Sequence, residues 1–305
     1  MARVLVLGAS GFMGRAIRRE LDAGGHQVAC VDRVAATAPS EGEEWFQLDL
    51  LDASLEEIVA VIRRLRPDVV INCAGLVDGT IEQLVRANVL LVARLLEVAT
   101  AESVRLVHLG SAAEYGASPH GSSVSEEDPP HPITSYAVTK LAGTLLVTRA
   151  VESGAVSGAA LRIFNPLGPG MPPGSMPGRA ASLVRDAVSS GARSITMGPL
   201  DAWRDFIDLR DVASAVVIVA LHAGESPPLL NVATGVAVQV REVVGAIAGA
   251  AGWQGEVIEE ASRASPRSAP VEWQQASTSR IEASLGWHPL HSVQEAAASV
   301  LPREP

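Results

Sequence analysis

The first 32 residues carry the pattern that most restricts the fold of this chain. An apolar run at 3–7 is followed by Gly8-Ala9-Ser10-Gly11-Phe12-Met13-Gly14, then by a helical pattern to about Ala23, and a second apolar run at 26–31 ends in Asp32. The glycines allow a tight turn and close approach of the backbone to a pyrophosphate, which the free N–H groups at a helix N-terminus stabilise. An acid after the second strand can accept hydrogen bonds from an adenosine ribose. The pattern therefore predicts a dinucleotide site.

The residues after the second strand leave the choice of dinucleotide open. Asp32 favours a free ribose 2′-hydroxyl, whereas Arg33, which follows it, can accommodate a 2′-phosphate. The sequence predicts NAD(P)(H) and does not separate NADH from NADPH.

Strand-like and helical runs continue to alternate along the chain. The expected strands are 45–48, 68–73, 104–109 and 159–164, and the expected helices end near 65 or span about 81–101 and 135–152. Such alternation is typical of an α/β protein with one doubly wound parallel sheet, the Rossmann type.

Proline and glycine then crowd residues 166–178, which predicts a rigid crossing into a second lobe. We expect residues 1–165 to form the dinucleotide-binding domain, with 205–224 returning to it. Residues 166–204 and 225–305 are then expected to form a smaller C-terminal lobe that binds the substrate.

The segment Ser135-Tyr136-Ala137-Val138-Thr139-Lys140 contains the only lysine, against 23 arginines. On a helix, Tyr136 and Lys140 share a face. A nearby cation lowers the pKa of a phenol from its usual value of about 10 and suits it to proton transfer. A compact ammonium can occupy a position where a planar guanidinium cannot. The pair is therefore a candidate catalytic unit.

Composition excludes several classes of function. The net charge of −10 argues against a sequence-independent nucleic-acid binder, and no apolar run reaches the roughly 18 residues that a membrane span needs. No secretory signal is recognised. Cys30 and Cys73 are expected to be buried free thiols in a reducing cytoplasm. The histidines show no metal-ligand spacing, so no metal site is predicted.

Taken together, the motifs resemble one family over the whole chain: the extended short-chain dehydrogenase/reductases of the NAD-dependent epimerase/dehydratase family, which act on nucleotide sugars. The resemblance implies that the Gly-rich turn, the ribose acid and its neighbour, an adenine-side pair, an N-x-A-[AG] turn and the Tyr/Lys pair bind the cofactor. These residues are Gly8, Ser10, Gly11, Phe12, Met13, Gly14, Asp32, Arg33, Asp49, Leu50, Cys73, Ala74, Gly75, Tyr136 and Lys140.

The resemblance also implies the catalytic set. Ser111, five residues before the Gly of Tyr115-Gly116, matches the family's catalytic Ser/Thr, and Tyr136 and Lys140 match Y-x-x-x-K. Asn88 matches an Asn of the family's proton relay. Because a buried Asn inside a helix must be hydrogen-bonded, Asn88 is either part of such a relay or a local structural link.

Substrate contacts follow from three further segments. Arg162–Pro166 with the Gly-Pro-Gly at 168–170 resembles R-x-F-N-x-x-G-P-G, Arg204–Val212 resembles R-D-F-[IV]-D-V-x-D-V, and 285–289 resembles L-G-[WY]-x-P. The resemblance implies that Asn165 and Arg204 bind a substrate diphosphate and that Ser111 and Tyr136 hold the reacting group. Arg267 is a further candidate for the diphosphate, because an Arg fork suits phosphate oxygens. A turn cap for Asn165, an ion pair for Arg204 and a solvated charge for Arg267 are the structural alternatives.

The reaction is narrowed by what the chain lacks. Related 4,6-dehydratases carry an acid where this chain has Ala112 and Ala113, and Glu114 stands one place too late. The sequence most resembles reductases of 4-keto-6-deoxy nucleotide sugars, and a 4-epimerase with tightly bound NAD is the main alternative. A 4,6-dehydratase and a non-catalytic dinucleotide-binding sensor rank below both. We expect a cytoplasmic homodimer formed by the helices that carry Asn88 and Tyr136.

Overall fold

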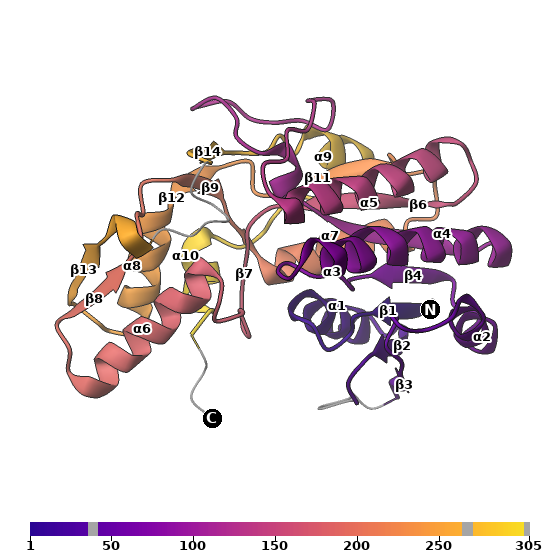
Figure 1. The fold of residues 1–305 in the computed structure, drawn as a ribbon, viewed down its shortest axis with the longest axis horizontal. Helices are drawn as coiled ribbons and strands as arrows, with labels where there is room; N and C mark the ends of the chain where they lie inside the picture. The colour runs from indigo at the N-terminus through magenta and orange to yellow at the C-terminus, as the bar shows by residue number, and fades with distance from the viewer. Residues whose placement is uncertain (36–41, 264–270, 302–305) are drawn as a thin grey trace.

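A seven-stranded parallel sheet forms the larger part of the molecule (Figure 1). The computed structural model describes residues 1–35, 42–263 and 271–301. The strands run in the order β11-β6-β5-β4-β1-β2-β3 and all neighbours are parallel, so the predicted doubly wound α/β fold is confirmed. Their bounds are β1 Arg3–Leu7, β2 Gln27–Asp32, β3 Glu44–Gln47, β4 Val69–Asn72, β5 Arg105–Ser111, β6 Gly158–Ile163 and β11 Leu229–Val232.

Helices cover both faces of this sheet because alternate strand residues point to opposite sides. In β1, Val4 and Val6 belong to a core with α1 (Phe12–Ala23) and α7 (Leu209–Leu221). Leu5 and Leu7 belong to a second core with α2 (Leu55–Leu65), α4 (Leu91–Glu102) and α5 (Ser135–Glu152). The strand order reverses between β1 and β4, which is where folds of this type bind ligands, at the carboxyl edge of the strands.

The helix expected over 81–101 is interrupted. It consists of α3 (Ile81–Val85), a π-helical segment at Arg86–Leu90, and α4. Asn88 lies inside the π segment, and its carbonyl oxygen lies so close to Gly143 of α5 that any Cβ at 143 would collide with it. Hydrophobic periodicity does not distinguish a single wide turn from an α-helix, so the sequence did not reveal this distortion.

The smaller lobe has its own apolar core and lies on the left of Figure 1. The chain enters it through β7 (Pro166–Leu167), which pairs with β10 (Ile207–Asp208). In the described residues, three helices belong to it: α6 Met176–Ser190, α8 Val240–Ala250 and α10 Val293–Ala298. One small sheet pairs β8 (Ser194–Met197) with β13 (Glu256–Glu259). In the other, β9 (Trp203–Asp205) lies between β12 (Ala237–Gln239) and β14 (Trp273–Gln274).

Two expectations about this half of the chain were wrong. β11 pairs with β6 at the edge of the main sheet, and Ile281 of α9 (Ser279–Leu285) and Trp287 lie in the same core as β1, so parts of 225–305 belong to the sheet domain. The single strand expected over 204–208 is divided into β9 and β10, which lie in different sheets. Both differences arise from long-range strand pairing, which local patterns do not encode.

No helix in the described ranges is both long and apolar enough to cross a membrane. Cys30 and Cys73 are both free thiols; Cys30 is buried, as expected, whereas Cys73 is half-buried.

The contact between α5 and the π segment predicts that Gly143→Ala destabilises the fold. The added methyl group would push α5 away from the Asn88 carbonyl, and such overpacking costs about 1–3 kcal/mol. Gly245 in α8 is the matched control, because nothing lies within 4 Å of a Cβ built there. Gly245→Ala should stabilise by about 0.4–1 kcal/mol. Urea unfolding of both variants checks the opposite signs, and an equal effect of the two substitutions would contradict the contact.

Candidate active site

The turn after β1 is shaped to receive a phosphate-bearing ligand. Gly8 has a φ of +72°, and a Cβ there would lie 2.8 Å from the Ala74 nitrogen, while a Cβ at Gly14 would collide with the Gly8 carbonyl. Gly11 precedes α1 without a side-chain cap, and the first turn contains no acid. The N–H groups of that turn therefore remain available to an anion. The residues present fit the pyrophosphate of a dinucleotide.

The predicted ribose acid lies beside this turn. Asp32 ends β2 and its carboxylate accepts hydrogen bonds from the nitrogens of Ser10 at 2.9 Å and Val34 at 3.4 Å. Asp32 is buried and Arg33, the next residue, is exposed. The residue that favours a ribose 2′-hydroxyl and the residue that can accept a 2′-phosphate therefore both lie at the end of β2. Asp49, expected on the adenine side, accepts from the Leu51 nitrogen at 3.0 Å.

The turn Cys73–Gly75 at the end of β4 is held by Asn72, the Asn of the N-x-A-[AG] motif, and by His108, whose part in the site the sequence did not reveal. Asn72 Oδ1 accepts from the Ala74 nitrogen at 3.1 Å, and its amide donates to His108 Nδ1 at 3.1 Å. His108 is fully buried, and burial and then Lys140 lower its pKa well below the usual value. The ring is therefore neutral and carries its hydrogen on Nε2, which has no hydrogen-bond partner in the described part of the chain. A polar residue in an apolar strand was the available signal.

Lys140 and Tyr136 lie one turn apart on α5, as predicted. Lys140 is buried and its Nζ donates to the Leu109 carbonyl near the end of β5. Burial lowers the pKa of Lys140 to about 8, although the charges of Glu114 and Cys73 oppose the change. The helix starts at this point because Thr134 accepts a hydrogen bond from the Ala137 nitrogen at 3.1 Å.

Asn88 supports the Tyr136 turn through its side chain. Its amide donates to the Leu76 carbonyl at 2.9 Å and to Thr139 Oγ1 at 3.1 Å, and its Oδ1 accepts from the Leu76 nitrogen at 3.0 Å. Thr139 in turn donates to the Tyr136 carbonyl at 2.9 Å. Of the two expectations for Asn88, the geometry supplies the local structural link. A relay through water stays a prediction.

Ser111 lies at the carboxyl end of β5, where the chain enters a 3₁₀ turn (Ala112–Tyr115). Its Oγ accepts from the Ala113 nitrogen at 3.2 Å, so the hydroxyl hydrogen remains available to donate to a ligand. The Ser111 nitrogen donates to Glu114 at 2.8 Å, which fixes the turn. Ser111 is thus a positioned donor at the ligand-binding edge of the sheet.

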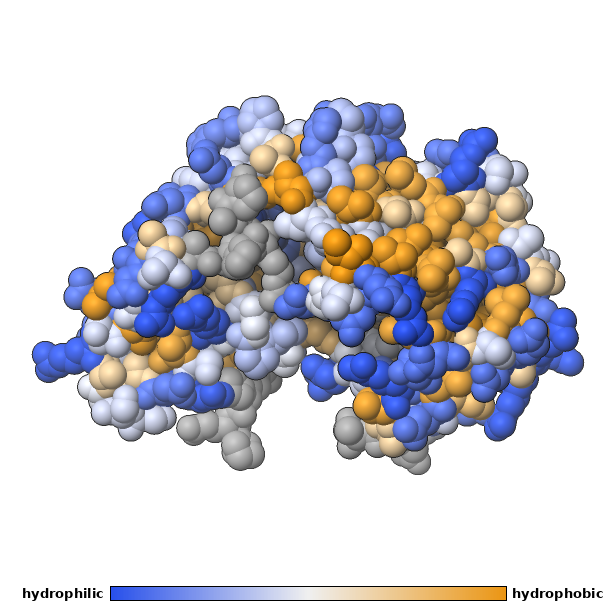
Figure 2. Space-filling model, in the orientation of Figure 1, coloured by the Kyte–Doolittle hydropathy of each residue, from blue (hydrophilic) through white to orange (hydrophobic). Residues whose placement is uncertain are grey.

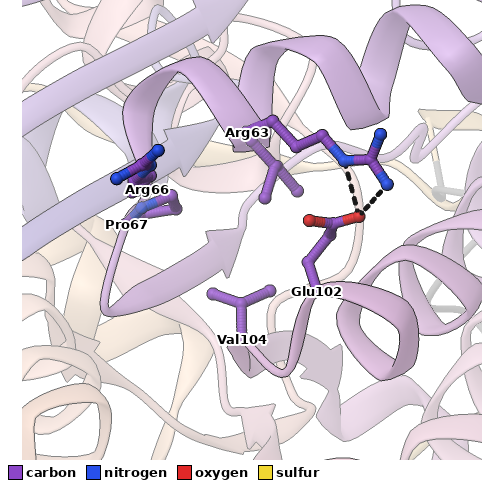
Figure 3. Close-up of a pocket in the computed structure, with 6 residues that line it drawn as sticks. Arg63, Arg66, Pro67, Glu102 and Val104 are labelled. Atoms are coloured by element: carbon purple, nitrogen blue, oxygen red, sulfur yellow. Dashed lines mark hydrogen bonds and ion pairs between the residues drawn. The ribbon is translucent and has the colours of Figure 1, made fainter.

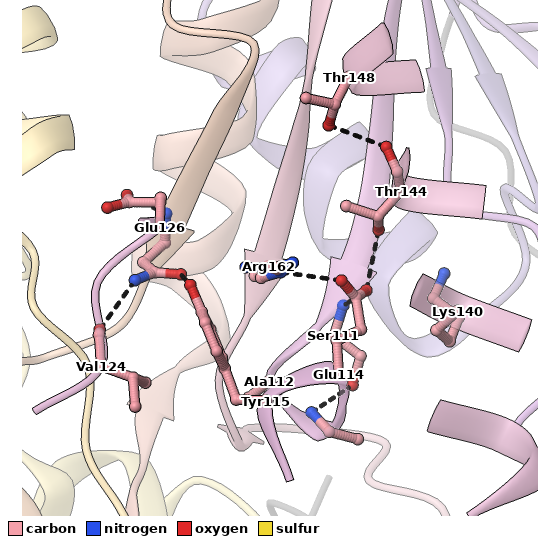
Figure 4. Close-up of polar contacts among 12 residues, drawn as sticks. Ser111, Ala112, Glu114, Tyr115, Val124, Glu126, Lys140, Thr144, Thr148 and Arg162 are labelled. Atoms are coloured by element: carbon pink, nitrogen blue, oxygen red, sulfur yellow. Dashed lines mark hydrogen bonds and ion pairs between the residues drawn. The ribbon is translucent and has the colours of Figure 1, made fainter. Parts of the chain in front are cut away.

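Glu114 is fully buried and wholly committed to structural contacts (Figure 4). It accepts from Arg162 Nε at 2.8 Å, from Thr144 Oγ1 at 2.8 Å and from Ser111. The Arg162 guanidinium lies 4.3 Å from the centre of the Tyr115 ring. This carboxylate is therefore not free to act as an acid or base on a substrate, which agrees with the argument against elimination.

Asn165 and Gln274 join the 3₁₀ turn Ala112–Tyr115 to the smaller lobe. The Asn165 amide donates to the Asp205 carbonyl at 2.8 Å and to Gln274 Oε1 at 3.3 Å, and Gln274 donates to the Ala112 carbonyl at 2.9 Å. Both Asn165 N–H groups are used, so a diphosphate contact by this residue would need these bonds to be exchanged.

Arg204 is buried in β9 and donates to the carbonyls of Trp203 at 2.8 Å and Val271 at 2.6 Å. Burial lowers its pKa to about 10, so it remains a cation at neutral pH. Arg267 lies outside the described residues. Within those residues, no group of three His, Cys, Asp or Glu side chains could hold a metal ion.

A surface pocket elsewhere is unrelated to this site (Figure 3). Arg63 and Glu102 form a 2.9 Å ion pair across it, and Pro67 and Val104 line it just before β4 and β5 begin. It therefore lies at the amino edge of the parallel strands, opposite the edge where this fold binds ligands.

Comparison with known proteins agrees with this geometry. The model of the NAD dependent epimerase/dehydratase family matches residues 4–233, which is well over half of the chain. The chain belongs to this family. It is an NAD(P)-dependent enzyme of the extended short-chain dehydrogenase/reductase type.

Three relatives represent the chemistry found in the family. A dTDP-6-deoxy-L-talose 4-dehydrogenase (NAD(P)(+)) of Kitasatospora kifunensis is 39% identical over 97% of this chain and 93% of its own length. The UDP-glucose 4-epimerase of Thermus thermophilus, solved with NAD, has a TM-score of 0.83 and 30% identity, and covers 98% of this chain and 97% of that one. RMD of Pseudomonas aeruginosa, solved with NADPH, has a TM-score of 0.83 and 26% identity over 99% and 98%.

The commitment of Glu114 to Arg162 predicts a large loss of stability in Glu114→Gln. The variant leaves a buried, uncompensated guanidinium, and breaking such a pair costs about 3–5 kcal/mol. Glu102→Gln is the control, since its partner Arg63 is largely exposed and surface pairs contribute about 1 kcal/mol or less. Chemical denaturation of both variants measures the difference, and comparable losses would disprove the special role of Glu114.

Proposed function

We propose that this enzyme uses NADH or NADPH to reduce the 4-keto group of a nucleoside-diphospho-4-keto-6-deoxy sugar. The observation that carries the proposal is the site at the end of β5. It holds a hydroxyl donor, Ser111, and a buried ammonium, Lys140, one helical turn after Tyr136, while the nearby acid, Glu114, is withdrawn into an ion pair. The set suits proton delivery to a carbonyl oxygen and lacks a free acid for elimination. The similarity to a 4-dehydrogenase over nearly the whole chain supports the same reaction type.

In the proposed reaction, Ser111 and Tyr136 donate hydrogen bonds to the substrate C4 carbonyl oxygen. The bound reduced nicotinamide supplies the hydride. As negative charge develops on the oxygen, Tyr136 transfers its proton to it and Ser111 stabilises it. Positioned donors of this kind are commonly the largest catalytic contribution.

Lys140 makes Tyr136 an effective proton donor. Its ammonium is held by the Leu109 carbonyl in a buried environment, one helical turn after Tyr136, and its charge is proposed to act there on the phenol. Because the pKa of Lys140 is about 8, most of the side chain is charged at pH 7. Deprotonation above pH 8 removes that charge and with it the support for the tyrosinate.

The substrate diphosphate is proposed to lie against the β9 side of the smaller lobe. Arg204 supplies a cation there, the family pattern adds Asn165, and Arg267 is the further candidate that the sequence offers. A nucleotide-sugar substrate is supported by the names of two relatives, the dTDP-6-deoxy-L-talose 4-dehydrogenase and the UDP-glucose 4-epimerase.

A nucleotide-sugar 4-epimerase is the second candidate. The same Ser/Tyr/Lys set would serve it, and the UDP-glucose 4-epimerase of Mycolicibacterium smegmatis is 28% identical over 98% of this chain. An epimerase retains its NAD and returns it oxidised, so the two candidates differ in whether reduced cofactor is consumed.

The proposal predicts stoichiometric loss of reduced nicotinamide absorbance when the enzyme meets a 4-keto-6-deoxy nucleotide sugar. A panel of such sugars is tested with NADH and with NADPH, and products are identified by mass and NMR. Tyr136→Phe should bind the cofactor like the wild type and lose turnover by orders of magnitude, because only the proton donor is removed. Conversion between 4-hydroxyl isomers without added cofactor would instead establish the epimerase, and full activity of Tyr136→Phe would refute the assigned role.

We also propose that the enzyme is a homodimer. Apolar side chains are exposed together over α3, the π segment and α5, on the right of Figure 2. They are Ile81 at 66% exposure, Leu90 at 49%, Val138 at 51%, Leu145 at 52% and Leu146 at 39%. A patch of this kind on two adjacent helices is suited to packing against the same helices of a second copy. A cytoplasmic location stays a prediction.

The dimer proposal predicts that Leu145→Glu yields a monomer, since two carboxylates would have to be buried at the contact. Val188→Glu is the control, because Val188 is 49% exposed on α6, away from these helices. Sedimentation velocity distinguishes the species. A monomeric wild type, or a dimer that survives Leu145→Glu but not Val188→Glu, would place the interface elsewhere or remove it.

A further inference from the structure

Arg15 occupies a position at the dinucleotide turn that the sequence motifs did not single out. It is the fourth residue of α1, and side chains on a helix lean back toward its N-terminus. Its guanidinium accordingly lies over the Gly-rich turn, where Nη1 donates to the Ser10 carbonyl at 2.5 Å. Ser10 is also the residue whose nitrogen binds Asp32. Arg15 is therefore placed at the part of the turn that faces a bound dinucleotide.

The electrostatics of this placement are unfavourable without an anion. The N-terminus of a helix carries partial positive charge, so a cation folded onto it is repelled. Within the three described ranges, no carboxylate lies within 4.0 Å of the Arg15 guanidinium, whose hydrogen bonds go only to carbonyl oxygens. Arg18, one turn later, shows the contrast: it forms an ion pair with Glu43 and lies over Trp45.

The crossing loop into the smaller lobe is fitted around the same guanidinium. Nη2 lies 3.5 Å from the Gly170 carbonyl oxygen. Gly170 has a φ of +77°, a backbone conformation that favours glycine, and a Cβ built there would lie 2.7 Å from Nη2. Arg15 thus reaches from the Gly-rich turn on one side to the crossing loop on the other, 155 residues away in sequence.

From these contacts we infer that Arg15 binds the pyrophosphate of the dinucleotide and holds it against the N-terminus of α1, with Gly170 as the second anchor of the guanidinium. Among the residues that the structure describes, two of its five N–H groups find acceptors, and the remaining N–H groups suit phosphoryl oxygens. NAD and NADP share this pyrophosphate. The inference therefore holds whether the enzyme is a reductase or an epimerase, and its test does not depend on turnover.

The test is to measure the dissociation constants of ADP-ribose, NADH, NADPH and adenosine by calorimetry or nicotinamide fluorescence, using the full chain freed of cofactor. Arg15→Gln should weaken the three pyrophosphate ligands to a similar degree, by about tenfold. Adenosine, which has no phosphate, should bind as it does to the wild type. Arg15→Lys keeps the charge but loses the planar guanidinium. Its dissociation constants for the three pyrophosphate ligands should lie between those of the wild type and those of Arg15→Gln.

Arg19→Gln is the matched control, because Arg19 is exposed one turn further along the same helix and its loss changes the net charge equally. It should leave all four constants unchanged, and both variants should keep the wild-type melting temperature. Unaltered ADP-ribose binding in Arg15→Gln would overturn the inference. Weakening of NADPH alone would assign Arg15 to the 2′-phosphate and overturn the pyrophosphate contact, and equal weakening by Arg19→Gln would reduce the effect to general charge.

Discussion

The buried pair between Glu114 and Arg162 is the interaction on which the site depends. It joins the end of β5 to β6, and through Thr144 it reaches α5. Arg162 also lies against the Tyr115 ring, whose hydroxyl donates to Asn231 of β11 at 2.8 Å. Four elements, β5, α5, β6 and β11, are thereby fixed around one charge pair. Because neither partner reaches solvent, the pair holds the 3₁₀ turn Ala112–Tyr115 in one conformation.

A second constraint is the burial of Lys140. Its Nζ lies against the Leu109 carbonyl near the end of β5, and burial lowers its pKa while Glu114 and Cys73 act in the opposite direction. The same low-dielectric surroundings keep His108 neutral. This neutral ring orients Asn72 and, through it, the turn Cys73–Gly75. One environment therefore produces two different protonation states in neighbouring groups, each suited to its position.

The sequence could predict those parts of the site whose residues lie close together in the chain. Gly8, Gly11 and Gly14, and the pair Tyr136 and Lys140, lie within one turn or one helix, so short-range rules place them correctly. The parts that it missed depend on tertiary contacts: the π segment at Asn88 forms against Gly143, and Gln274 meets Ala112 only after both lobes have folded. β11 returns to the sheet by pairing with β6, which no local pattern encodes.

Helix α5 has one buried face and one exposed face. Its inner face carries Lys140 and Thr144, and its outer face exposes Val138 and Leu145. A substitution on this helix therefore acts on buried contacts or on the exposed surface, according to the face that carries it. The smaller lobe has a separate core and contacts the 3₁₀ turn Ala112–Tyr115 through a few hydrogen bonds from Asn165 and Gln274. Side chains in the core of that lobe can accordingly be changed while the buried contacts of α5 stay as they are.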